Sequence, residues 1–268
     1  MPRISKRDGE QRFANDLANA PQGIGATRTN LQRLLHSLDF IGWSKSEESG
    51  RLDRRALTKF ATGSVNVFSR RQHIQAETSA VSVLIDCSGS MKDGDNKVSR
   101  IQIAQQVTVH LSKMLQQARV PFAVTGFRNG NVEYLSNGGT MECPHFLPFK
   151  PWGKTLQQSL ATIGSINQSA QGGTPDYTAL ANAIDELAVR PEHRRILFII
   201  TDAEGYQRAH MEHLQRIADK VGVTIVAIGI QSYSVTRCFV NAVSVSDLSD
   251  LGKTAFNQLL KAVQRKAH

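Results

Sequence analysis

The stretch VSVLIDCSGSM, residues 81–91, decides the fold of this chain. Residues 81–85 form a short apolar run, which is typical of a strand buried on both faces of a sheet. A polar loop follows at once, and residues 98–119 then carry apolar side chains at roughly helical spacing. A buried strand, a polar loop and a long helix in this order predict the first strand and helix of a parallel α/β sheet.

The same alternation of short β-branched runs and longer amphipathic segments continues along the chain. It predicts an α/β fold with a doubly wound, mainly parallel sheet. The expected strands are 121–127, 196–201 and 223–230, and the expected helices are 176–189, 210–221 and 247–263. Asn129 and Gly130 predict a hairpin turn that leads into an antiparallel edge strand at 131–135. Residues 138–153, which include three prolines, are expected to form an irregular loop.

The first 75 residues follow a different pattern. Glycines interrupt short helical stretches such as 31–40 and 52–61. We therefore expect a basic, mostly helical N-terminal appendage at 1–75 and one α/β domain at 76–268. The segment 52–71 holds too many large apolar side chains for a solvated linker, which predicts that it packs on the α/β domain.

The net charge of +9 is concentrated in the same appendage. Residues 1–75 hold 13 Lys and Arg against 7 Asp and Glu, and the remainder holds 19 against 16. A basic segment can attract nucleic acid or an acidic protein. Its arginine clusters have no interleaved aromatic residues and match no recognised nucleic-acid motif, so a solvated or protein-binding face is favoured over nucleic acid.

Composition also bears on the compartment. No window approaches the ~18 uninterrupted apolar residues that a membrane span needs, and the N-terminus lacks the apolar stretch of a secretory signal. The three cysteines are widely spaced and form no C-x-x-C pair, which argues against a disulfide framework and against a structural zinc site. These features predict a cytoplasmic protein with free thiols and no membrane association.

Oxygen-bearing side chains gather in the loop after the first buried strand. Asp86, Ser88 and Ser90 alternate along this loop, which lies at the carboxyl end of the strand, where open α/β sheets bind ligands. Two further segments fall at the same edge of the predicted sheet, and they add the hydroxyl of Thr174 and the carboxylate of Asp202. Carboxylate and hydroxyl oxygens are ligands that Mg2+ prefers, so these five residues predict one divalent metal site.

Each of these residues also fits a purely structural role. A serine can cap the following helix, and an aspartate can end a strand or form a turn through its own backbone. The occurrence of all five at the expected strand ends favours the metal site. No Walker A sequence, G-x-S-x-G elbow or H-E-x-x-H helix is present, so the chain alone is not expected to be catalytic.

The order D-x-S-x-S, then Thr, then Asp matches the metal-ion-dependent adhesion site of von Willebrand factor A (VWA) domains. Several segments from about residue 50 onward also resemble the C-terminal VWA region of the cobaltochelatase CobT subunit, namely SVNVFSRR, VSVLIDCSGSM, RRILFIITD and VAIGI followed by Val235-Thr236-Arg237. The resemblance implies a VWA/Rossmann-like fold, a bound Mg2+, with Mn2+ as an alternative, and a non-catalytic adaptor for an AAA+ ATPase of the MoxR or CobS kind.

Two departures separate this chain from a full CobT subunit. It lacks the long N-terminal part and the acidic stretch of that subunit, and its Gly173-Thr174-Pro175-Asp176 loop is closer to general VWA domains. A short relative whose metal receives a carboxylate from its AAA+ partner is therefore favoured. The alternatives are a true cobaltochelatase subunit in cobalamin biosynthesis, and a nucleic-acid-binding scaffold that uses the basic appendage.

Overall fold

A computed structural model describes residues 5–19, 41–47, 51–52, 68–73, 79–95, 98–134 and 140–246. The chain divides into two compact units, one made of Met1–Leu34 with Thr78–His268 and the other of Leu35–Glu77. The smaller unit contains an antiparallel sheet in the order β1-β3-β2, with β1 at Ile41–Glu47, β2 at Arg51–Leu52 and β3 at Phe68–His73.

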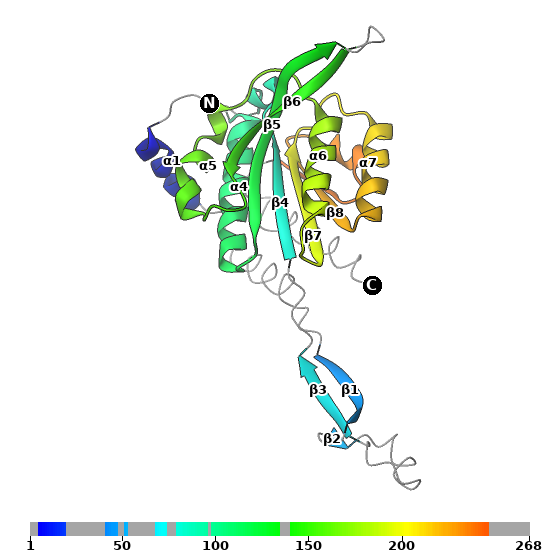
Figure 1. The fold of residues 1–268 in the computed structure, drawn as a ribbon. Helices are drawn as coiled ribbons and strands as arrows, with labels where there is room; N and C mark the ends of the chain where they lie inside the picture. Colours follow the sequence, from blue (N-terminus) through cyan, green and yellow to red (C-terminus); the bar gives the residue numbers. More distant parts are fainter. Residues whose placement is uncertain are drawn as a thin grey trace. The chain divides into compact units, whose positions relative to one another are not determined.

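A six-stranded sheet in the order β6-β5-β4-β7-β8-β9 forms the centre of the larger unit (Figure 1). Its strands are β4 (Ser79–Asp86), β5 (Phe122–Tyr134), β6 (Thr140–Lys150), β7 (Arg194–Thr201), β8 (Val223–Ile230) and β9 (Ala242–Val245). All neighbouring pairs are parallel except β5 and β6. The predicted fold class, a mainly parallel α/β sheet with one antiparallel edge strand, is confirmed.

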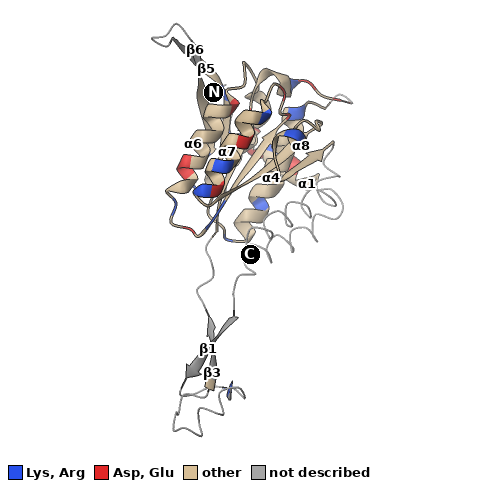
Figure 2. Cartoon of the chain, turned by 90° about the vertical axis from the view of Figure 1, so that its right-hand side faces the viewer, with Lys and Arg blue, Asp and Glu red and all other residues tan. Residues whose placement is uncertain are grey.

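Helices cover both faces of this sheet (Figure 2). On one face, α6 (Asp176–Ala188) and α7 (Arg208–Lys220) pack against each other and against alternate residues of the central strands, such as Ala80 and Leu84 of β4. On the other face lies α4 (Arg100–Gln117), which carries the apolar spacing seen in the sequence. Every residue of β4 is buried, as expected for a strand covered on both sides.

The antiparallel edge differs from the one expected from the sequence. Asn129 and Gly130 do not form a turn, because β5 continues through them, and residues 138–153 are mostly strand β6 rather than a loop. The register of β5 against β6 shifts between Asn129 and Val132, which is a bulge rather than a hairpin turn. A Cβ on Gly130 would lie 2.9 Å from the carbonyl oxygen of Cys143, so this glycine permits close approach of the two strands.

The first helix belongs to the larger unit, although the sequence placed it in the appendage. Helix α1 (Lys6–Ala18) buries Phe13 and contacts α5 (Leu160–Ile163) and α4. A Cβ on Gly9 would overlap the backbone of Ala161, so the two backbones touch directly. Asp16 accepts a 2.6 Å hydrogen bond from Nε2 of Gln105 in α4. Packing and a partly buried hydrogen bond therefore join α1 to the α/β core.

Other sequence predictions fall beyond the described residues. These are the helices at 31–40 and 247–263 and nearly all of the helix at 52–61, and the packing of 52–71 on the α/β domain stays a prediction. Strand β9 was not expected from the sequence. In the part of the chain that the structure describes, no helix has the length and apolar character needed to cross a membrane.

Candidate metal centre

The two aspartates of the predicted site lie at the ends of neighbouring parallel strands. Asp86 is the last residue of β4, and Asp202 directly follows β7. The register pairs Ile85 with Ile200, so Asp86 lies level with Thr201, and Asp202 follows one position later at the same edge of the sheet. Both aspartates are buried, and the Thr201 hydroxyl donates a 2.8 Å hydrogen bond to Oδ2 of Asp86. Two buried carboxylates thus lie at the edge of the sheet where the sequence predicted a ligand site.

The loop after β4 turns its two serines toward each other. The backbone N–H of Ser88 donates to Oδ1 of Asp86 at 2.9 Å, which holds the carboxylate and the loop together. The hydroxyl oxygens of Ser88 and Ser90 lie 3.0 Å apart. Asp86, Ser88 and Ser90 therefore form one hydrogen-bonded group of oxygen atoms.

A second loop, residues 171–174, is attached to the first through the backbone. The N–H of Gly89 donates to the carbonyl oxygen of Gly172, and the N–H of Gln171 donates to that of Cys87, both at 2.8 Å. Gly172 has a φ of +78°, a conformation that glycine adopts without strain. Thr174 follows two positions later in this second loop and is half-buried. The backbone bonds therefore bring the loop of Thr174 to the serine loop.

Burial dominates the electrostatics of Asp86. It raises the pKa of this carboxyl to about 6, the Ser88 hydrogen bonds lower the pKa, and the negative charge of Asp202 raises it again. Tyr206 approaches from the loop after β7, with its hydroxyl 3.4 Å from Oδ2 of Asp86. Burial and the charge of Asp86 hold the pKa of Tyr206 well above its usual value, so it stays a neutral hydrogen-bond donor.

Arg100, at the start of α4, is a functional candidate that the sequence analysis missed. Its Nη1 lies 2.9 Å from Oδ2 of Asp202 and 3.2 Å from Oε2 of Glu204. The other oxygen of Asp202 accepts the Glu204 N–H at 3.0 Å. The guanidinium thus balances one of the two buried carboxylates. Neither Arg100 nor Tyr206 stands in a motif, so only the folded arrangement identifies them.

The described residues give little support to a metal site built from other ligand types. They contain no group of three or more His, Cys, Asp and Glu that could hold a metal by those ligands alone. Cys87 lies between Asp86 and Ser88 in the loop after β4, but burial raises the pKa of its thiol to about 12, so the thiol remains protonated. The donor set of the site is therefore carboxylate and hydroxyl oxygen, which fits a hard cation such as Mg2+ and does not fit zinc.

Comparison with known proteins agrees with this architecture. Residues 81–204 match the family model of the von Willebrand factor type A domain. Among solved structures, the PilB minor pilin from Streptococcus sanguinis has a TM-score of 0.51 and 17% identity, and the match covers 74% of this chain and 64% of that one. The pilus adhesin SpaC from Lactobacillus rhamnosus GG has a TM-score of 0.50 and 13% identity, with 72% and 31% covered.

This chain therefore spans about a third of the adhesin and somewhat less than two thirds of the pilin, and at these identities the likeness concerns the fold alone. A comparison with curated proteins found no match. The matched residues include both aspartates and the loops between β4 and β7 that carry the candidate metal centre. Over residues 81–204, the sequence match, the sheet order and the loop geometry all agree with a von Willebrand factor type A domain.

Proposed function

We propose that this chain binds one divalent cation, Mg2+ or alternatively Mn2+, and through it a carboxylate of a partner protein. The protein ligands would be Asp86, Ser88, Ser90, Thr174 and Asp202. The observation that carries the proposal is the fully buried Asp86, whose carboxylate is hydrogen-bonded to the serine loop and lies near enough to Asp202 for their charges to interact. Two like charges in a buried site are unfavourable unless a cation offsets them.

Charge balance supports an anionic partner. Arg100 pairs with the buried Asp202 and also with Glu204, which is exposed. The two buried aspartates, this arginine and a divalent cation would together carry one net positive charge, and the exposed Glu204, screened by solvent, offsets it only in part. Mg2+ takes six oxygen ligands in near-octahedral geometry, and five protein groups leave one position for another oxygen. When bound, the cation would supply an electrophilic point that attracts a carboxylate.

For the partner, we propose an AAA+ ATPase of the MoxR or CobS kind, with this chain as a non-catalytic adaptor. The support is the sequence resemblance to the CobT subunit, in particular the residues Val235-Thr236-Arg237 after VAIGI. The chelatase and nucleic-acid alternatives stay predictions from the sequence.

The partner proposal can be tested by co-elution on size exclusion with the AAA+ ATPase encoded by the same organism. We expect a complex in Mg2+ that dissociates in EDTA, because removal of the cation leaves two carboxylates that repel the partner's acidic group. The control is the ATPase alone in EDTA, which must remain assembled. A complex of equal strength in Mg2+ and in EDTA would contradict a metal-mediated contact.

Metal affinity should depend on pH in a direction that the raised pKa of Asp86 determines. Below pH 6 this carboxyl holds a proton, which the metal must displace, and above pH 6 the carboxylate is free to bind. Mg2+ affinity should therefore be constant above about pH 7 and fall roughly tenfold per pH unit below about 6. Calorimetric titration at several pH values measures this. Equal affinity at about pH 5 and pH 7.5 would exclude Asp86 as a direct ligand.

A further inference from the structure

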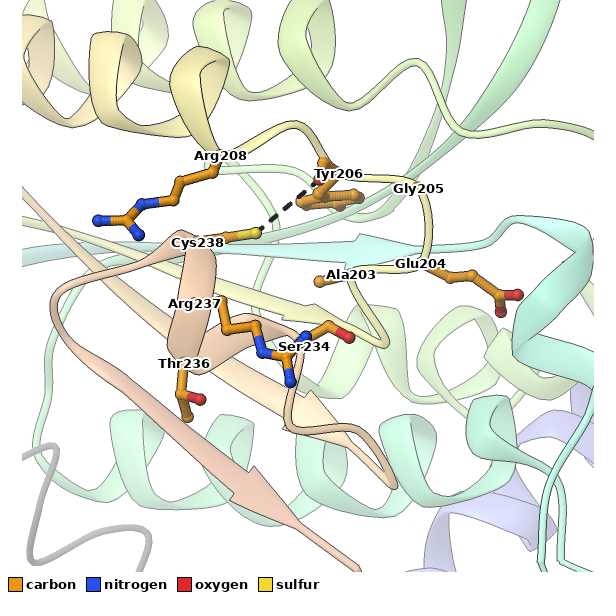
Figure 3. A pocket seen from close by; sticks show the side chains of 9 residues that line it. All are labelled: Ala203, Glu204, Gly205, Tyr206, Arg208, Ser234, Thr236, Arg237 and Cys238. Carbon is orange, nitrogen blue, oxygen red and sulfur yellow. Dashed lines mark hydrogen bonds between the residues drawn. The ribbon is translucent and has the colours of Figure 1, made fainter.

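A cavity of about 670 Å³ lies beside the candidate metal centre. Two segments line it, the loop from β7 into α7 and the region around α8 (Val235–Cys238), as Figure 3 shows. The lining residues are Ala203, Glu204, Gly205, Tyr206, Arg208, Ser234, Thr236, Arg237 and Cys238. Two arginines against a single carboxylate make this cavity basic.

The two arginines come from different elements, and both line the cavity close enough to Cys238 to affect the pKa of its thiol. Arg208 is the first residue of α7, and Arg237 lies in α8 (Figure 3). Burial raises the pKa of the Cys238 thiol and the negative charge of Asp176 raises it further, while the positive charges of both arginines lower it. Arg208 binds Glu212 through Nε alone, at 2.7 Å, and Arg237 forms no ion pair with any residue that the structure describes. Guanidinium N–H groups thus remain to bind an anion.

Among the described residues of the lining, one is acidic, and it already has a cationic partner. Glu204 lies 3.2 Å from Nη1 of Arg100, outside the cavity's lining, and because Arg100 also pairs with Asp202 it offsets the charge of Glu204 only in part. Ser234 and Thr236 add hydroxyl groups to the wall. Arginine pairs with nearby hydroxyls are a common arrangement for binding carboxylate and phosphate groups, because the guanidinium presents parallel N–H donors.

The cavity and the metal centre share one segment of chain. Ala203 and Glu204 directly follow Asp202, and Tyr206 places its hydroxyl 3.4 Å from the carboxylate of Asp86. A polypeptide that reaches the metal centre therefore lies beside the cavity as well. Residues of such a partner that continue along this segment would reach the cavity and its two arginines.

We propose that this cavity binds a second carboxylate of the partner segment whose first carboxylate occupies the metal. The recognised segment is then an acidic stretch with at least two Asp or Glu side chains. This inference rests on the proposed function. It also assigns a role to Thr236 and Arg237, two residues of the sequence motif that the metal centre leaves unexplained.

The test uses the full-length chain and a short fluorescent peptide of alternating glutamate and glycine, with binding measured by fluorescence anisotropy. The variants are Arg208→Ala, Arg237→Ala and, as a matched control, Arg216→Ala. Arg216 is an exposed arginine further along α7 that does not line the cavity. Each variant is titrated in Mg2+ and in EDTA, and thermal melting checks that each remains folded.

We expect binding that requires Mg2+, is weakened roughly tenfold by Arg237→Ala and severalfold by Arg208→Ala, and is unchanged by Arg216→Ala. Mg2+-dependent binding that is insensitive to Arg208 and Arg237 would overturn the cavity inference and leave the proposed function intact. Binding that depends on these arginines but not on Mg2+ would overturn the proposed function.

Two further outcomes would overturn the assignment of the cavity to a carboxylate. An equal loss in Arg216→Ala would mean that the peptide responds to overall charge rather than to this cavity. A phosphoserine peptide that binds in an arginine-dependent way, where the glutamate peptide does not, would identify phosphate as the recognised group.

Discussion

Asp86→Ala is expected to abolish Mg2+ binding, with a loss of affinity of at least about a hundredfold. The carboxylate of Asp86 is fully buried and is held in place by the Ser88 N–H and by the Thr201 hydroxyl. Its removal takes one of two negative charges from a poorly solvated site, where charge interactions are strongest. It also leaves the hydroxyls of Thr201 and Tyr206 without their acceptor.

Calorimetric titration with Mg2+ measures this effect, and thermal melting gives a second readout. For the wild type, Mg2+ at about a hundred times its dissociation constant should add about 2.7 kcal/mol to the free energy of unfolding, and for Asp86→Ala it should add nothing. Asp93→Ala is the matched control, because Asp93 is exposed and its loss changes the net charge by the same amount. Equal Mg2+ binding by both variants, or none by the wild type, would rule out this site.

Phe13→Ala should lower the free energy of unfolding by about 3 kcal/mol, because a buried aromatic side chain is replaced by a cavity at the interface of α1 with the α/β core. For a chain of this size the melting temperature should fall by roughly 6–12 °C. The result matters because the sequence predicted an appendage at 1–75 in which only the segment 52–71 packs on the α/β domain, so loss of one side chain from α1 would have little effect.

Urea unfolding of full-length Phe13→Ala measures the change, and Gln11→Ala is its control. Gln11 lies on the same helix, and its hydrogen bond to Asn15 is exposed, so its removal should change stability by less than about 0.5 kcal/mol. If Phe13→Ala and Gln11→Ala unfold at the same urea concentration, α1 does not contribute to the stability of the core.

The central strands were predictable because a strand that is buried on both faces consists of a continuous run of apolar residues. β4, β7 and β8 are short apolar runs bounded by polar loops, and the structure places them within one or two residues of their predicted bounds. Strand β6 was not predictable by the same reasoning. It contains Pro144 and Pro148, which are usual in loops and are tolerated in a sheet only at an edge, where β6 lies.

The residues of the candidate site also differ in whether the sequence alone could predict them. Asp86, Ser88 and Ser90 could be proposed from sequence because parallel strands bring their carboxyl ends to one edge, which makes the position of a strand-end residue nearly independent of packing detail. The roles of Arg100 and Tyr206 depend on how the start of α4 and the loop after β7 approach that edge. Such approaches are decided by tertiary packing, and no local pattern encodes them.

The hydrogen bonds that join residues 87–89 to residues 171–172 have a consequence for the rate of metal exchange. They are backbone bonds of the chain itself, so the approach of the two loops does not depend on any ligand. A site whose loops are already fixed can take up an ion without first ordering a segment, so little conformational entropy is lost on binding. Amide hydrogen exchange at Gly89 and Gln171 should then be slow and nearly the same in Mg2+ and in EDTA, and ion uptake should be limited by dehydration of the cation rather than by loop closure.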